Sequence, residues 1–152
     1  MKTTSLRWLY VFVLITALTW IVFNIWAFNG QWPQQAKDFA FILINLGIVG
    51  GLFFPVLVVL LGKKVLPAVD KRIYPDRMDS FRISDNLVFR VLRLNGYAAA
   101  INSKRARRLN PLPIDLRTLP DHLRIPIVFY LYWMVLHGVA LVIGALALEF
   151  LA

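Results

Sequence analysis

The sequence predicts an all-α membrane protein with three transmembrane helices, an N-terminus inside the cell and a C-terminus outside. Hydrophobic residues make up 59% of the 152 residues, and the mean hydropathy of +0.66 exceeds the usual range of a soluble domain. The excess is concentrated in three blocks, each about as long as the 20 or so apolar residues that cross a hydrocarbon core of about 30 Å. Between the second and third blocks lies a polar stretch that holds all but three of the 17 lysines and arginines.

These blocks divide the chain into three parts with different roles. The expected parts are a transmembrane hairpin at 1–61, with spans at about 8–28 and 39–61, a basic and partly helical cytoplasmic segment at 62–124, and a third transmembrane helix at 125–152.

Charge placement predicts the orientation of these parts. Cytoplasmic loops of membrane proteins concentrate lysine and arginine, so the basic segment and the N-terminus, with Lys2 and Arg7, belong inside. The short link between the first two spans carries only Lys37, which Asp38 offsets, so it belongs outside. Three spans require the same alternation, which places the C-terminus outside.

The first block has aromatic residues at both ends, as expected at the two interfaces of a bilayer. A secretory signal peptide also starts with positive charge, but its apolar region is shorter and ends in a small-residue cleavage site. The sequence at Trp26–Asn29 offers no such site, so we expect a retained helix. Turn residues at Asn29–Pro33 leave only a short link to the second block, which forces an antiparallel hairpin.

The second block contains glycines that favour close helix packing. Gly47 and Gly51 have the small-xxx-small spacing that lets the backbone of a neighbouring helix approach within the membrane. Pro55 removes one backbone hydrogen bond and is expected to kink the helix. A breaker and two cations, Gly62–Lys64, then end the helix at the cytoplasmic side.

The basic segment starts irregularly and becomes amphipathic. Prolines and scattered acids at 65–82 predict a linker along the surface, and Ser84 with Asp85 predicts a helix start. At 100° per residue, apolar residues from Leu87 to Ile101 share one face and basic residues line the adjoining face. Because Asn95–Gly96 interrupts the pattern, the sequence leaves open whether 84–108 is one helix or two. The predicted contact residues of the basic face are Arg90, Arg93, Lys104, Arg105, Arg107 and Arg108.

The third block is expected to begin near Ile125. Thr118 and Asp121 have capping-box spacing, which predicts a short helical turn before the span, and Pro126 suits a first helical turn. Ala140 and Gly144 form a second close-packing pair, whose expected partner is the glycine face of the second helix.

Three polar residues fall inside the predicted spans: Asn24, Asn45 and His137. By residue count they lie at depths that would let them meet. Polar groups are costly within a bilayer and often functional, so His137 is a candidate contact for a quinone, a haem or a coupling ion. The alternative, which we favour, is an interhelical hydrogen bond worth about 0.6–2 kcal/mol.

Enzymatic signatures are missing from the sequence, which has no Gly-rich phosphate loop, HExxH, GxSxG or cysteine. We therefore expect no catalytic activity, no metal and no cofactor. The basic face is expected to contact anionic phospholipid or a partner protein, with nucleic acid the least favoured ligand.

The expected function is that of a non-catalytic accessory or scaffold subunit of a larger complex in the inner (plasma) membrane. The chain would pass the membrane several times and dock by helix packing. Two alternatives stay open: a redox or transport subunit that uses His137, and a free-standing homo-oligomer. A bound cofactor would favour the first, and a single species larger than one chain the second.

Overall fold

The computed structural model of this chain describes residues 6–29, 35–77 and 85–151, which form helices and turns and include no strand. The helices are α1 (Arg7–Ala27), α2 (Ala36–Lys64), α3 (Leu66–Ile73), α5 (Leu87–Asn102), α6 (Lys104–Leu109) and α7 (Asp121–Leu151), with 3-10 turns η1 (Pro75–Arg77) and η2 (Leu116–Thr118). By length and composition, α1, α2 and α7 are each able to cross a membrane. The prediction of an all-α chain with three spanning-length helices is confirmed, and the orientation stays a prediction.

Residue contacts divide the chain into two compact units. The first, which we call the bundle unit, comprises residues 7–54 and 132–152. The second, which we call the platform unit, consists mainly of residues 55–131. Helices α2 and α7 contribute residues to both units, and each unit is described by itself.

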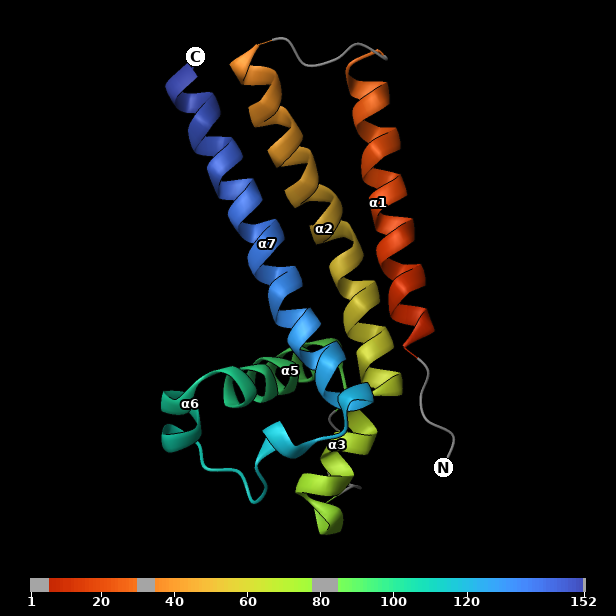
Figure 1. Cartoon of the computed structure of the whole chain (residues 1–152), viewed down its shortest axis with the longest axis vertical. Coiled ribbons are helices and arrows are strands. Elements are labelled where there is room, and N and C mark those ends of the chain that lie inside the picture. Colours follow the sequence, from red (N-terminus) through yellow and green to blue (C-terminus); the bar gives the residue numbers. More distant parts are fainter. Residues whose placement is uncertain (1–5, 30–34, 78–84, 152) are drawn as a thin grey trace. The chain divides into compact units, whose positions relative to one another are not determined.

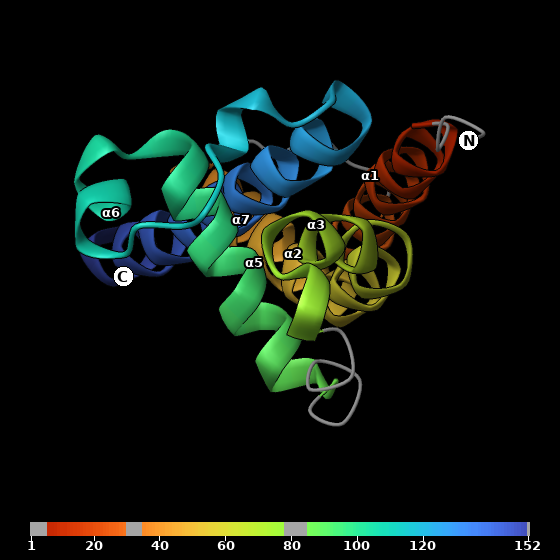
Figure 2. The same ribbon diagram turned by 90° about the horizontal axis from the view of Figure 1, so that it is seen from below.

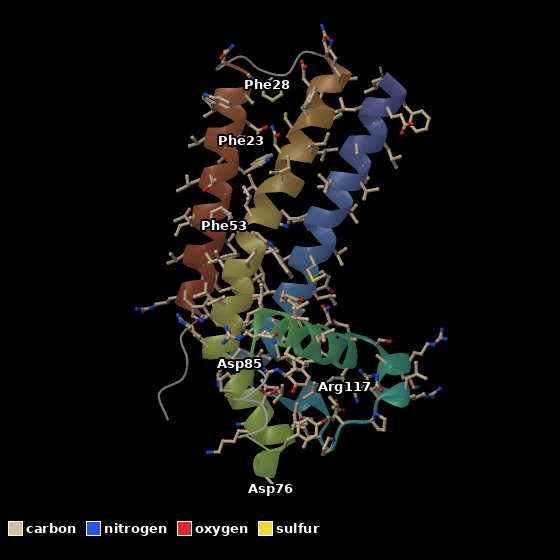
Figure 3. All side chains as sticks on the ribbon, turned by 180° about the vertical axis from the view of Figure 1, so that it is seen from behind. Phe23, Phe28, Phe53, Asp76, Asp85 and Arg117 are labelled. Carbon is tan, nitrogen blue, oxygen red and sulfur yellow. The ribbon has the colours of Figure 1, made fainter. Side chains whose placement is uncertain are left out.

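In the bundle unit, the first part of α2 lies between α1 and the last part of α7 (Figure 1). The ring of Phe12 on α1 packs edge-on against Phe53 of α2, which is labelled in Figure 3, with centroids 6.1 Å apart. It also packs, in a tilted arrangement, against Trp133 of α7, with centroids 5.0 Å apart. Buried Thr16 satisfies its hydroxyl by donating to the carbonyl of Phe12 at 2.7 Å. Aromatic contacts therefore hold the first helix against the other two.

The platform unit contains a helix, α3, within the stretch for which the sequence predicts a linker. The prediction of an irregular stretch at 65–82 is wrong for the residues that form α3. Residues 78–84 lie outside the described ranges. Pro67 stands in the first turn of α3, where its missing N–H costs no hydrogen bond. The buried residues of α3 recur at helical spacing: Leu66, Val69, Asp70 and Ile73. Figure 2 shows α3 beside α5, which crosses it at an angle.

The stretch that follows consists of two helices, but the break lies later than the Asn95–Gly96 interruption. Asn86 caps α5, since its side chain accepts from the N–H of Phe89 at 3.0 Å. The chain leaves helical geometry at Ser103, which in turn caps α6. Gly96 lies inside α5, and the expected start at Ser84 falls outside the described residues.

Replacing Gly96 with alanine is expected to stabilise the platform unit by about 0.5–1 kcal/mol. Glycine inside a helix costs this much relative to alanine, and a Cβ at Gly96 would meet nothing within 4 Å. Thermal unfolding in detergent measures the change. Gly62→Ala is the control, because a Cβ there would lie 2.5 Å from Cδ of Arg90, so a gain of the same size in Gly62→Ala would contradict the reasoning.

The third spanning-length helix begins earlier than its apolar block. The short helical turn expected before this helix is present as η2, and Asp115 caps that turn: its carboxylate accepts from the N–H of Arg117 at 3.0 Å. Since α7 already begins at Asp121, Pro126 lies inside the helix and not in its first turn. The length of the apolar block does not show this extension, because Asp121, His122 and Arg124 are polar.

Candidate functional site

The platform unit is organised around a buried carboxylate. Asp70 of α3 is only 2% exposed. A guanidinium nitrogen of Arg93 donates to one of its oxygens at 2.5 Å, and the hydroxyl of Tyr97 donates to the other at 2.5 Å. Both donors belong to α5, so the carboxylate joins α3 to α5. Burying a charge is tolerated when it is paired and hydrogen-bonded in this way.

A second carboxylate extends the group into what we call the charge cluster, which comprises Asp70, Asp85, Arg90, Arg93 and Tyr97. Arg93 also donates to Asp85 at 2.7 Å. Arg90 binds Asp85, which is labelled in Figure 3, through two nitrogens, at 3.0 and 2.6 Å. Two arginines and two aspartates therefore balance their charges within the chain.

In the charge cluster, burial has the largest effect on the pKa values of Asp70 and Tyr97, and hydrogen bonding has the largest effect on the pKa of Asp85. Burial raises the pKa of Asp70 above its ordinary value, although the hydrogen bond from Tyr97 and the charge of Arg93 pull it down. Burial, with the neighbouring Asp70, also raises the pKa of Tyr97. The hydrogen bond from Arg90 lowers the pKa of the more exposed Asp85.

The residues of the predicted basic face therefore separate into three groups. Arg90 and Arg93 were expected to contact lipid or a partner, but they point into the charge cluster and are largely covered, with side chains 16% and 14% exposed. Arg107 donates to the carbonyls of Ala100 and Ile101, where it satisfies the end of α5. Lys104, Arg105 and Arg108 are exposed.

Two of the three polar residues predicted inside the spans meet in the bundle unit. The side-chain amide of Asn45 on α2 donates to the side-chain oxygen of Asn24 on α1 at 3.2 Å. Asn24 in turn donates to the carbonyl of Trp20 at 2.8 Å. This interhelical hydrogen bond satisfies amides that would be costly in an apolar surrounding.

His137 is buried, at 8% exposure, and bonds within its own helix. Its Nδ1 lies 2.8 Å from the carbonyl oxygen of Trp133, which can only accept, so Nδ1 carries the hydrogen and Nε2 holds a lone pair. The imidazole lies against the indole of Trp133, with centroids 4.1 Å apart. The Nε1–H of Trp133 donates to the carbonyl of Gly50 at 3.3 Å, which joins α7 to α2.

Glycines let α2 and α7 approach closely in the bundle unit. A Cβ at Gly47 would lie 2.6 Å from Cβ of Leu141, and one at Gly50 would overlap the ring of His137. From the other helix, a Cβ at Gly144 would lie 2.8 Å from the carbonyl oxygen of Ala40. Gly144 is buried in this contact, and Ala140 is buried one turn before it.

Gly51, the expected second member of the packing pair, is not at this contact. It is exposed, and a Cβ there would meet nothing within 4 Å, so Gly50 takes its place. Gly138 of α7 is likewise exposed with open space around it. Spacings of three and four residues both keep two glycines on one helix face, and only the partner helix decides between them.

The platform unit contains a small cavity beside η2. This cavity, of about 220 Å³, lies between the end of α5 and η2, and its polar lining includes Arg107, Asn110 and Asp115. Within the described ranges, no group of three or more His, Asp or Glu residues could hold a metal ion.

Comparison of this chain with protein-family models, with curated proteins and with solved structures finds no match.

Proposed function

We propose that this protein is a non-catalytic accessory subunit of a larger complex in the inner membrane, with its N-terminus inside. In this proposal, helices of a partner dock against α2 and α7 within the bilayer. The exposed cations of α6, Lys104, Arg105 and Arg108, contact anionic lipid or a cytoplasmic subunit.

The observation that carries the proposal is the open surface at Gly51 and Gly138. The residues just before them, Gly50 and His137, touch each other across the α2–α7 contact. Helices α2 and α7 run antiparallel, and each successive residue of a helix is rotated by about 100° around its axis. The residue after Gly50 and the residue after His137 therefore point to the same side of the contact. The two exposed glycines therefore lie on one side of the pair, where the backbone of a partner helix could approach closely.

A backbone feature supports the same surface. Pro55 has no N–H, so the carbonyl of Gly51, four residues earlier, lacks its usual helical donor. Freed carbonyls in membrane helices are ordinarily satisfied by neighbouring helices, side chains or water. A polar side chain of a docked helix would supply that donor.

A second candidate function rests on His137. Because its Nδ1–H is held by the carbonyl of Trp133, Nε2 is oriented as an acceptor, which is how proteins prepare histidines that bind metals or quinones. In this alternative the protein is a redox or transport subunit. The quinone, haem or coupling ion that His137 contacts would be held mainly by a partner chain.

Purification in a gentle detergent, with mass identification of co-purifying chains, tests the proposal. We expect colourless partners in stoichiometric amounts, and we expect the double variant Gly51→Leu and Gly138→Leu to lose them. Ala17→Leu, on the exposed face of α1, is the matched control and should retain them. A chain that purifies alone, or as a homo-oligomer, would contradict the proposal, and haem absorbance or extractable quinone would favour the alternative.

A further inference from the structure

Helix α5 covers its charged side chains and exposes apolar ones, the opposite of a helix on the surface of a soluble protein. Its arginines, Arg90 and Arg93, turn inward to the charge cluster, whereas its exposed residues between Leu87 and Gly96 are apolar. Val88 is 66% exposed and Leu92 58%, and Gly96 continues the same stripe at helical spacing. We call Val88, Leu92 and Gly96 the apolar stripe, and the exposed Leu87 and Phe89 adjoin its first residue.

Val88 and Leu92 of the apolar stripe face away from α3, and Gly96 lies at the side of α5. Tyr97 and Arg93 point to Asp70 of α3. At about 100° per residue, Val88 lies on the opposite side of α5 from Tyr97, and Leu92 lies about 140° from it. Because α3 follows the lysine pair that ends α2, it belongs to the aqueous side of that boundary. The apolar stripe is therefore directed to the opposite, hydrocarbon side.

Two contacts fix the depth of α5. Asn95 accepts a hydrogen bond from the hydroxyl of Tyr130 on α7 at 3.0 Å, and the stem of Arg90 covers Gly62 on α2. Along α7, about 28 Å of helix separates Tyr130 from Glu149, close to the thickness of a bilayer's hydrocarbon core. Along α2, the same thickness counted back from Gly62 ends within the apolar block near Ile42. Both contacts place α5 at the boundary between hydrocarbon and headgroups.

We propose that α5 is an in-plane membrane helix whose apolar stripe, Val88, Leu92 and Gly96, inserts into the acyl chains at this boundary. The occupant of the stripe is lipid, and the charge cluster is what allows the insertion, because it shields two arginines that would otherwise face hydrocarbon. Exposed Lys104, Arg105 and Arg108 follow on α6, where they meet the headgroup layer. This inference rests on the membrane location in the proposed function but not on any docking partner.

Spin labels on the single chain test the proposal. The protein has no cysteine, so single substitutions give uniquely labelled full-length protein in nanodiscs of phosphatidylcholine. This zwitterionic lipid is chosen because it offers no net charge to the cations of α6. Val88→Cys and Leu92→Cys carry the test labels. Val22→Cys, at an exposed position of α1, is the reference for a label in lipid. Lys71→Cys, at an exposed position of α3, is the reference for a label in water.

Labels at Val88 and Leu92 should collide with dissolved oxygen as often as the label at Val22 does. Their spectra should not show the broadening by an aqueous nickel chelate that the spectrum of the label at Lys71 shows. Nickel broadening at Val88 and Leu92 as strong as at Lys71 would overturn the proposal. Protection from both reagents would overturn it as well, because the stripe would then be covered by protein. Loss of a partner in the co-purification test leaves this measurement unaffected, so the two failures can be told apart.

Discussion

Asp70→Ala is expected to loosen the contact between α3 and α5 by about 3 kcal/mol. Removing one partner of a buried ion pair costs about 3–5 kcal/mol, since the other charge stays buried. The cost should fall at the lower end because Arg93 keeps its bond to Asp85. Hydrogen exchange measures this directly: amides of α3 and α5 should lose protection by about two orders of magnitude, which corresponds to this free energy.

An exposed ion pair supplies the matched control for Asp70→Ala. Asp115 and Arg117 approach to 2.5 Å, and hydrogen bonding to Arg117 lowers the pKa of Asp115 to about 2, but both side chains are open to solvent. Exposed pairs contribute little, so Asp115→Ala should leave exchange in α3 and α5 unchanged. Equal effects of the two substitutions would show that burial of Asp70 carries no energetic weight.

The companion variant Arg93→Ala should respond to pH. Burial already raises the pKa of Asp70 above 3.8, and loss of Arg93 removes an influence that lowers it. The folded variant then holds the proton more tightly than the unfolded chain, so its stability rises as pH falls from 7 through this raised pKa toward 3.8. The deficit of Arg93→Ala should shrink on acidification, whereas that of Asp70→Ala, which lacks the carboxylate, should not. Parallel deficits would contradict the mechanism.

The membrane-spanning helices could be predicted because apolar length is a property of consecutive residues. The interior of the platform unit could not, because it depends on residues far apart in the chain. The sequence indicates that Arg90, Arg93 and Tyr97 share one side of a helix. It does not indicate that Asp70, 23 residues before Arg93, covers that side. With no protein partner indicated for Arg90 and Arg93, the sequence predicts that they contact water or lipid at the surface.

A usable signal for Asp70 was nevertheless present. Leu66, Val69 and Ile73 recur at the spacing of a buried helix face, and Asp70 falls on the same face. An acid within an apolar stripe indicates a partner elsewhere, and the arginines of the following helix are the available cations. The prolines at 67 and 75 outweighed this pattern, although proline in the first turn of a helix or after its end is compatible with it.

Gly50→Ala is expected to be the most damaging small substitution in the bundle unit. The added Cβ would overlap the imidazole of His137, and overpacking of a close contact costs about 1–3 kcal/mol. Movement of His137 would also disturb its bond to Trp133 and the bond from Trp133 to Gly50. Unfolding in mixed micelles, followed by tryptophan fluorescence, should show a loss near the upper end of that range.

Two other glycines serve as controls for Gly50→Ala, and a substitution of His137 tests whether the loss comes from the clash with its ring. Gly51→Ala and Gly138→Ala place a Cβ in open space, so neither should destabilise the isolated chain, and each adds at most the gain of about 0.5–1 kcal/mol expected for alanine inside a helix. His137→Ala removes the ring but keeps a Cβ, so combining it with Gly50→Ala should recover part of the loss, giving a coupling of about 0.5–3 kcal/mol. If the two losses simply add, His137 and Gly50 do not touch, and the α2–α7 contact is not built on this glycine.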